Sequence, residues 1–304
     1  MRFNRDYSFI KNRRYFFIFS IAISVIGAVM LAVLGLNYGV DFKAGSNVDI
    51  AVTKSMSDQK AEIEQYLSEA GFSNSTVTVG ADRVGIRFDE VLQPDKENQL
   101  KIDFASKFDP NASMEVNTVD VEMARELQMN ALIAMLVASL GIIVYIAIRF
   151  EWRFAIAAII SLAHDAFIVI SVFSILRLEV NLPFIVAVLT IIGYSINDTI
   201  VVFDRIRENL RFSKIRSSQD LAAVVDSSIW QTMARSINTV ITVIFAALCL
   251  YIFGSESLKM FSLAMLIGLI SGGYSSVFIA SPIWYVLKNK EKKKKPAINA
   301  QTAP

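Results

Sequence analysis

Two ionisable residues, one inside a long apolar stretch of this sequence and one at the start of another, are the residues best placed to do chemistry. Asp198 follows Asn197 inside the stretch GYSINDTIVVFDRIREN, which covers residues 193–209, and Arg235 opens another apolar stretch. A charge near the centre of a bilayer costs about 2.5–3.5 kcal/mol on insertion scales, so such a carboxyl needs a proton, a cation or water. An Asp198 that is ionised beside Arg235 and neutral when apart from it would carry protons. The alternative is a fixed Asp198–Arg235 pair that only joins two helices.

A second polar pair, His164-Asp165, lies near the middle of the third apolar stretch. Because His titrates near neutral pH, the pair suggests a proton relay. Adjacent residues of a helix point in different directions, however, which favours polar packing against the Asn and Thr side chains of neighbouring helices. Asn238, with Thr239 and Thr242, can supply such hydrogen bonds from the start of the fifth stretch.

Other kinds of chemistry find little support in the residue pattern. No phosphate-binding glycine loop, metal-ligand cluster or nucleophilic triad can be recognised in the sequence. We therefore expect no metal, no cofactor and no enzymatic activity of the chain itself. The single Cys249 cannot form an intramolecular disulfide.

The elements that position these residues are membrane spans. The chain has 304 residues, of which 54% are hydrophobic, and its mean hydropathy of +0.47 lies above that of ordinary soluble domains. Six apolar runs are long enough to cross a bilayer, and they cover residues 15–36, 129–148, 154–176, 182–204, 236–253 and 260–287. We interpret the first run as an uncleaved signal anchor. The last run is long and is expected to break at Gly272-Gly273 and Pro282.

The cations are distributed unevenly between alternate connections. Four segments hold 19 Lys and Arg, namely residues 1–14, 149–153, 205–235 and 288–295. The two short loops on the other side hold only Arg177 and Lys259. By the positive-inside rule both termini, residues 1–14 and the polybasic tail 288–304, face the cytoplasm. The connection 205–235 is amphipathic and predicts a helix on the bilayer surface, with a docking helix for a cytoplasmic partner as the alternative.

Residues 37–127 separate the first two runs and have the composition of a small folded domain outside the cytoplasm. Their pattern predicts strand, helix, strand, strand, helix and strand, the order of a ferredoxin-like α+β domain. The strands are expected at 47–53, 76–79, 84–88 and 114–119, and the helices at 57–70 and 94–108. Ser57 is the expected cap of the first helix. The second helix is indicated by Leu100, Ile102, Phe104 and Phe108.

Four segments of the chain form a pattern that has a known counterpart. They are GYSINDTIVVFDRIREN at 193–209, YGVDFKAG at 38–45, RFEWRF at 149–154 with His164-Asp165 after it, and RSINT at 235–239. Taken together, in their order along residues 1–287, these segments resemble the SecD/SecF family of bacterial protein-export membrane proteins. Gly39, Asp41, Phe42 and Gly45 carry the match in the second segment, in which Ala44 stands where the family has a glycine.

The resemblance implies a fold and a function. The fold is an α-helical polytopic membrane protein, in which six transmembrane helices form half of a resistance-nodulation-division (RND) bundle of 12 helices, with a small ferredoxin-like α+β periplasmic domain. The function is a subunit of the Sec translocase that uses the proton gradient to complete export across the bacterial inner membrane. The alternatives are half of a proton-coupled small-molecule transporter of the same superfamily, and a structural assembly subunit.

The resemblance also implies partners and site residues. The partners are SecD as the second half of the bundle, the SecYEG channel, YajC, membrane lipid and an unfolded preprotein on the periplasmic side, and no nucleic acid. Asp198 and Arg235 match the family's proton-handling pair, and Gly39 to Gly45 match a motif at a hinge beside the first span. The resemblance assigns no role to His164 or Asp165.

Overall fold

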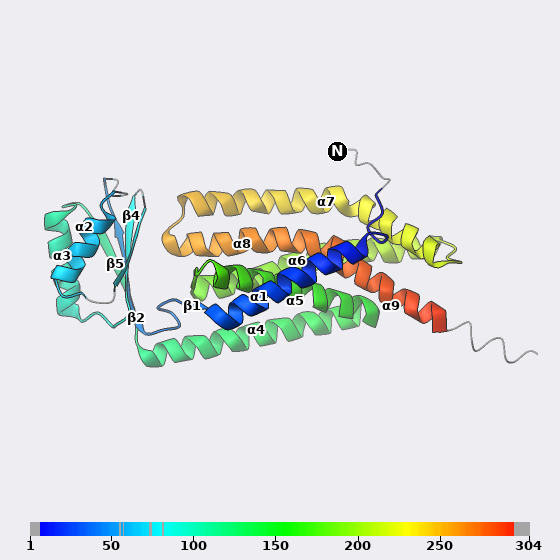
Figure 1. Cartoon of the computed structure of the whole chain (residues 1–304), viewed down its shortest axis with the longest axis horizontal. Coiled ribbons are helices and arrows are strands. Elements are labelled where there is room, and N and C mark those ends of the chain that lie inside the picture. Colours follow the sequence, from blue (N-terminus) through cyan, green and yellow to red (C-terminus); the bar gives the residue numbers. More distant parts are fainter. Residues whose placement is uncertain (1–6, 55, 57, 73–74, 81, 295–304) are drawn as a thin grey trace, which may run out of the picture. The chain divides into compact units, whose positions relative to one another are not determined.

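The computed structural model describes residues 7–54, 56, 58–72, 75–80 and 82–294, and Figure 1 colours the chain in sequence order. The chain divides into two compact units. The bundle unit comprises Met1–Asn37, Met135–Leu178 and Pro183–Pro304, and the α+β unit comprises Tyr38–Ala134 and Glu179–Leu182. Residues 1–6, the end of the polybasic tail at 295–304 and the expected cap Ser57 lie outside the described residues.

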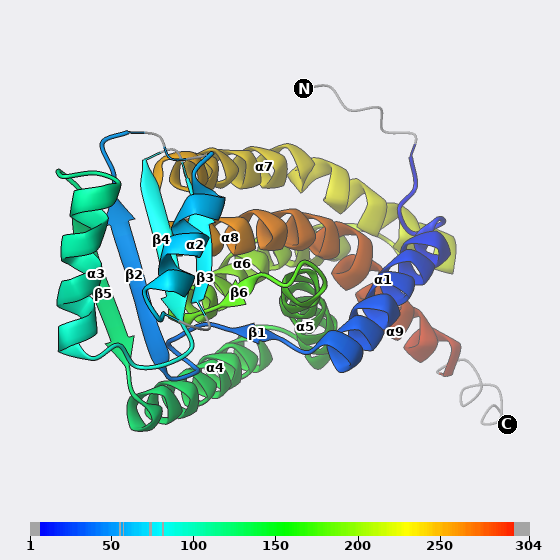
Figure 2. The same ribbon diagram turned by 60° about the vertical axis from the view of Figure 1, so that its left-hand side comes forward.

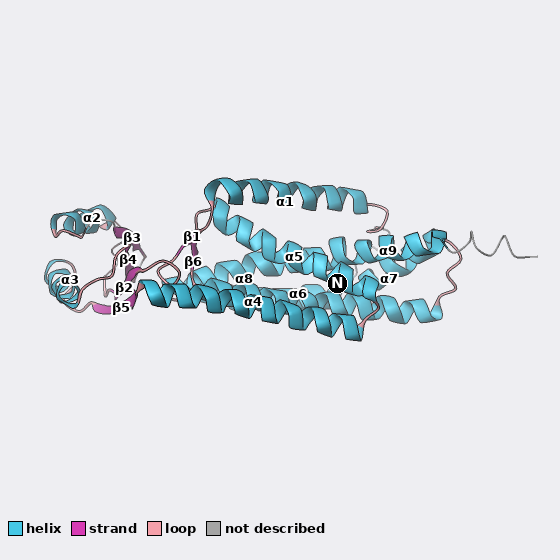
Figure 3. Ribbon diagram, turned by 90° about the horizontal axis from the view of Figure 1, so that it is seen from below, coloured by secondary structure: helices cyan, strands magenta, loops and turns pink. Residues whose placement is uncertain are grey.

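Six helices within the described ranges are long and apolar enough to cross a membrane, which confirms the expected number of spans. They are α1 (Arg13–Leu34), α4 (Val121–Arg149), α5 (Trp152–Ile175), α6 (Leu182–Phe212), α7 (Ser218–Phe253) and the stretch that starts with α8 (Glu256–Ser275). In the bundle unit α1 lies along α5, α8 lies between α5 and α7, and these neighbours can be followed in Figures 1 and 3. The outer faces of α1 and α4 leave many large apolar side chains exposed, as expected of helices that face lipid.

The connection at 205–235 differs from the sequence expectation. Residues 205–212 continue α6 and residues 218–235 begin α7, so only 213–217 connect the two helices. Ser217 starts α7 with a capping box, in which its side chain accepts from the Asp220 amide and Asp220 accepts from the Ser217 amide.

The apolar face of this part of α7 is enclosed by protein. Leu221, Val225 and Ile229 are each no more than 1% exposed. An apolar stripe has the same sequence pattern whether lipid or protein covers it, and here protein covers it. The expected surface helix is therefore wrong, and this segment is a packed extension of a long helix.

The last span breaks as expected, but between the two predicted positions. After α8 the chain forms a π-helical turn, η1 (Ser276–Ala280), and then continues as α9 (Ser281–Lys294). Pro282 has no amide hydrogen to donate into the preceding turn, and the Ser281 hydroxyl donates to the Ser276 carbonyl at 2.9 Å. A π-turn inside a long helix is frequently found at a functional site.

The α+β unit has the predicted order of elements. Its sheet contains β2 (Gly45–Ala51), β3 (Ser75–Val79), β4 (Arg83–Phe88) and β5 (Ser113–Val119), and its helices are α2 (Lys60–Glu69) and α3 (Pro94–Lys107). The strand order β3-β4-β2-β5, visible in Figure 2, and the antiparallel pairing of all neighbours are those of a ferredoxin-like fold. This prediction is confirmed, with strand ends within two residues of the expected ones.

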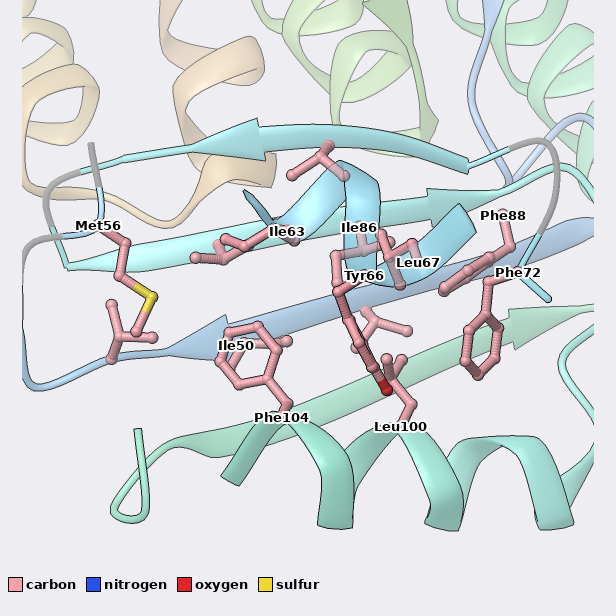
Figure 4. Packing of buried hydrophobic residues seen from close by; sticks show 14 of the residues in the cluster. Ile50, Met56, Ile63, Tyr66, Leu67, Phe72, Ile86, Phe88, Leu100 and Phe104 are labelled. Atoms are coloured by element: carbon pink, nitrogen blue, oxygen red, sulfur yellow. The ribbon is translucent and has the colours of Figure 1, made fainter. Parts of the chain in front are cut away.

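One face of this sheet packs against both helices and forms the core of the unit (Figure 4). Ile50 and Ile86 from the sheet meet Leu67 of α2 and Leu100 of α3, and all four are fully buried. Ile102 lies in α3 as expected but is 68% exposed. Position 102 lies two residues from both 100 and 104, about 200° around a helix of 3.6 residues per turn, so it faces away from them.

Candidate functional site

The candidate site lies inside the bundle unit and contains two carboxyl groups, Asp165 on α5 and Asp198 on α6. Asp165 is completely buried. Its carboxylate accepts hydrogen bonds from three serine hydroxyls, Ser195 on α6 at 2.6 Å and Ser271 and Ser275 on α8 at 2.7 and 2.6 Å. A buried carboxyl is tolerated when hydrogen bonds replace its lost hydration. Asp165 therefore ties three helices together through one side chain.

The neighbours of Asp165 complete a polar cluster. Ser161, one helical turn earlier on α5, donates to Ser275 at 2.9 Å, and His164 Nδ1 lies 3.2 Å from Asp165 Oδ1. The expected polar packing of the His-Asp pair is present, but its partners on other helices are serines rather than Asn or Thr. Asn238 is exposed, and Thr239 and Thr242 donate to carbonyls of their own helix.

Asp198 has a more open environment than Asp165. It is half-buried, and its Oδ2 accepts a hydrogen bond from Ser276 at 2.8 Å, whereas Asn197 before it is exposed. Ser276 begins the π-turn and directly follows Ser275, which binds Asp165. Two consecutive serines thus hold two carboxyls that belong to different helices.

A groove opens beside Asp198 between α6, α7 and α8. Its walls include Asn197 and Asp198 of α6, Thr239 of α7, and Gly272 and Gly273 of α8. We call it the Asp198 groove. Asp198 therefore borders a space of about the size that one water molecule needs, whereas Asp165 is enclosed.

Arg235 stands apart from Asp198 in this structure. It is exposed on α7, one turn before Thr239, and within the described ranges it forms no ion pair with Asp198. The expected pair is therefore not formed in this arrangement.

Glycines on α8 allow this helix to approach α6 closely. A Cβ atom at Gly272 would lie 3.2 Å from the Ser195 Cβ, and one at Gly268 would collide with Ile191. Small residues commonly permit such contact between helices in membranes. The close approach brings the hydroxyls of α8 within reach of both carboxyls.

The sequence pattern did not single out the serines of this cluster as candidate site residues. Ser271 and Ser275 are four residues apart in an apolar run and hence share one helix face. That spacing could have indicated a polar contact with a neighbouring helix. The signal is weak, because serine in a membrane helix can also bond to the backbone of its own helix. No group of three or more His, Cys, Asp or Glu in the described part of the chain could hold a metal ion.

The glycine-containing segment 38–45 organises three separate parts of the α+β unit. The Gly39 amide donates to the Val180 carbonyl at 2.8 Å, extending the short pairing of β1 (Asn37–Tyr38) with β6 (Glu179–Val180). Asp41 Oδ2 accepts from the Leu182 amide, at the first residue of α6, at 2.8 Å. Phe42 is buried, and its carbonyl accepts from Gln128 of α4.

Gly45 is required by close packing rather than by an unusual backbone angle. A Cβ atom at this position would collide with the Phe88 carbonyl. Within the described ranges, neither Gly45 nor Ala44 has a positive φ angle. Alanine is accordingly compatible with the backbone at position 44, where the family pattern has glycine.

Comparisons with known proteins agree with this architecture. The family described as "Protein export membrane protein SecD/SecF, C-terminal" matches residues 100–290, and the one described as "SecD/SecF GG Motif" matches residues 29–56. Protein translocase subunit SecF of Alicyclobacillus acidocaldarius is 44% identical, and the match covers 95% of this chain and 95% of that protein. Protein translocase subunit SecDF of Bacillus subtilis is 45% identical over 96% of this chain, which spans only 40% of the relative.

A solved structure shows the same arrangement of helices and strands. The crystal structure of SecDF from Thermus thermophilus has a TM-score of 0.83 and 32% sequence identity, and the match covers 95% of this chain and 40% of the solved one. Both the family profiles and a relative matched over nearly its whole length point to one group. The chain belongs to the SecD/SecF family of protein export membrane proteins.

Proposed function

We propose that the chain is a membrane subunit of the Sec export machinery that uses the proton gradient to complete the release of exported polypeptides. One observation carries the proton-linked part: a half-buried carboxyl, Asp198, lines the Asp198 groove inside a bundle of membrane helices. A carboxyl at such a position can take up and lose a proton as its access to water changes. Each proton that crosses the membrane releases about 2.3 kcal/mol per 100 mV, enough to shift a conformational equilibrium.

The proposed partners and membrane orientation follow from the chain's relatives and charges. A SecD-like chain supplies the second half of the bundle, as the fused SecDF relatives suggest. The bundle lies in the bacterial inner membrane with both termini in the cytoplasm, because Lys and Arg are concentrated in those segments. The α+β unit then lies in the periplasm, where it meets the unfolded preprotein that SecYEG delivers, and YajC is an accessory partner.

The hydrogen bond of Ser276 gives the proton a structural effect. While Asp198 is ionised, it accepts the Ser276 hydroxyl and holds the start of the π-turn against α6. Protonation replaces a charge-assisted hydrogen bond with a weaker neutral one, so the π-turn is held less firmly. Arg235, one turn before the groove residue Thr239 on α7, is the cation proposed to attract ionised Asp198 when the two helices approach.

Replacement of Asp198 by Asn tests this function, because Asn has nearly the same shape and cannot titrate. We expect Asp198→Asn to abolish the stimulation of preprotein release by the proton gradient in membrane vesicles, while the complex with its SecD-like partner is recovered normally. Asp204→Asn is the matched control, since Asp204 lies two turns further along α6 in exposed ion pairs with Arg149 and Arg207. Gradient-dependent release that survives in Asp198→Asn would refute the proton relay, and loss of complex recovery would favour a role in assembly.

A further inference from the structure

One edge of the sheet in the α+β unit carries backbone groups that are free to pair. The hydrogen bonds at the ends of the ladders determine which residues these are. The Gly80 amide donates to the Arg83 carbonyl, and the Val52 amide donates to the Asp82 carbonyl. In an antiparallel pair, alternate residues of a strand direct both their N–H and C=O groups to the same side.

This alternation can be followed across the sheet to β5. Because Arg83 bonds towards β3, the even-numbered residues of β4 face β2, and in the register Val48↔Ile86 the even-numbered residues of β2 face β4. The odd-numbered residues of β2 then face β5, and the register Asp49↔Glu115 places the odd-numbered residues of β5 in that ladder. The N–H and C=O groups of Met114, Val116 and Thr118 therefore point outward from the sheet. In the described part of the chain no other backbone group bonds to them.

Features that commonly protect an edge strand are missing from β5. Its sequence, SMEVNTV, contains no Pro and no Lys, and its seven residues pair one-to-one with β2 without a bulge. Its one charged residue is Glu115, which belongs to the inward-bonded set. The edge is thus long, regular and almost uncharged.

The side chains along this edge leave room for another strand. Met114 and Val116 are only partly buried at the border of the core, whereas Val77, on the opposite edge strand β3, is 2% exposed. A strand added beside β5 can cover apolar surface and also satisfy three N–H and three C=O groups. The edge at β3 is shorter, with five residues, and offers less apolar surface to cover.

We propose that β5 binds an extended segment of the exported polypeptide by adding it to the sheet as a further strand. This inference rests on the proposed export function, which brings an unfolded chain to this domain. Strand addition uses main-chain hydrogen bonds for affinity, so it accepts polypeptides of many sequences. An export subunit needs that tolerance, because its clients share an extended backbone rather than a side-chain pattern.

The test removes one outward N–H group without removing a bond of the ladder. Val116→Pro deletes the outward donor at the centre of β5, at a kind of position where edge strands tolerate proline. Val116→Ala is the matched control, because it trims the side chain and keeps the donor. The probe is a fluorescent ten-residue peptide of alternating Thr and Val, and binding to the full chain in lipid nanodiscs is measured by anisotropy. Protection of the Glu115 amide from hydrogen exchange reports whether the ladder with β2 stays intact.

We expect the unmodified chain and Val116→Ala to bind the peptide within about threefold of one another and Val116→Pro to bind about tenfold more weakly, the size of one or two lost hydrogen bonds. A version of the peptide with every amide N-methylated should not bind, which tests the same interaction without altering the protein. Equal binding of the two peptides, or binding unchanged by Val116→Pro, overturns the proposal. Loss of the SecD-like partner from Val116→Pro with peptide binding unchanged assigns the edge to subunit contact instead.

The Asp198→Asn variant separates this proposal from the export function. It should bind the peptide normally, because Asp198 lies in the bundle unit and β5 lies in the other. A chain that supports gradient-dependent release but does not bind the peptide overturns the role of β5 alone. Peptide binding by a chain without gradient-dependent release overturns the proton relay alone.

Discussion

Asp165 and Asp198 are two carboxyl groups in very different surroundings within one bundle. Asp165 is enclosed and has three hydroxyl donors, whereas Asp198 is half-buried beside a groove and has one. Pairs of titratable groups whose environments differ commonly divide their roles. We infer that Asp165 holds α5, α6 and α8 in register and that Asp198 exchanges the proton.

If the two carboxyls have these different roles, Asp→Asn should lower the free energy of unfolding more at position 165 than at position 198. Asp165→Asn places an amide NH2 among the hydroxyls of Ser195, Ser271 and Ser275, so a buried hydrogen-bonding group loses its acceptor. The free energy of unfolding should fall by about 1–3 kcal/mol. Asp198→Asn, with one partner and partial exposure, should lower it by less than about 1 kcal/mol. Thermal unfolding in detergent compares the two variants, and equal losses would contradict a structural role specific to Asp165.

Asp109 in the α+β unit predicts how acid affects this domain. Hydrogen bonds from the Thr53 hydroxyl and amide, both at 2.6 Å, and from the Asn111 amide at 3.0 Å hold the pKa of Asp109 below its ordinary value of 3.8. A carboxyl whose pKa is lowered by folding contributes stability above the ordinary pKa and loses it as pH falls through the folded value.

The stabilisation from Asp109 should therefore be fully present and independent of pH near neutral pH, and it should be lost below about pH 4. Hydrogen exchange of the β2 amides between pH 3 and pH 6 measures this, with the known pH dependence of the chemical exchange rate taken into account. Asp109→Asn should lower protection at pH 6 and reduce its decline towards pH 3. A decline of the same size in both proteins would assign the acid sensitivity to other groups.

At the scale of the element, local pattern predicted the α+β unit well and the long helices less completely. Alternation and the Pro94 start placed the strands and α3 because their signals are local. The extension of α7 was missed because an apolar stripe does not reveal what covers it. The Asp198 environment could be anticipated from a carboxyl in an apolar run, but the serines around Asp165 come from two other helices, and a sequence does not show which faces meet.

The start of α6 offers an element-level prediction, because its first amide is capped from a distant segment. Asp41→Ala removes the acceptor for the Leu182 amide and should cost about 0.5–2 kcal/mol of stability, as loss of a helix cap commonly does. Asp41→Asn keeps an acceptor oxygen and should cost less. Hydrogen exchange at the first turn of α6 measures both variants. Equal protection in Asp41→Ala and the unmodified chain would show that this contact does not hold the helix end.

At the scale of the whole molecule, two helices belong to both units. Residues up to Ala134 of α4 are part of the α+β unit and the rest of α4 is part of the bundle, while α6 begins in the α+β unit with Leu182. The two units are therefore joined by continuous helices as well as by the segment at 35–37. A movement of α4 or α6 therefore has a covalent route from one unit to the other.

The cap on α6 has a mechanical consequence. Asp41 holds the first residue of a helix that continues without interruption to Asp198, 16 residues later, which corresponds to about 24 Å of helix. The stretch of chain between the carboxyl and the capped residue therefore contains no loop that could absorb a displacement.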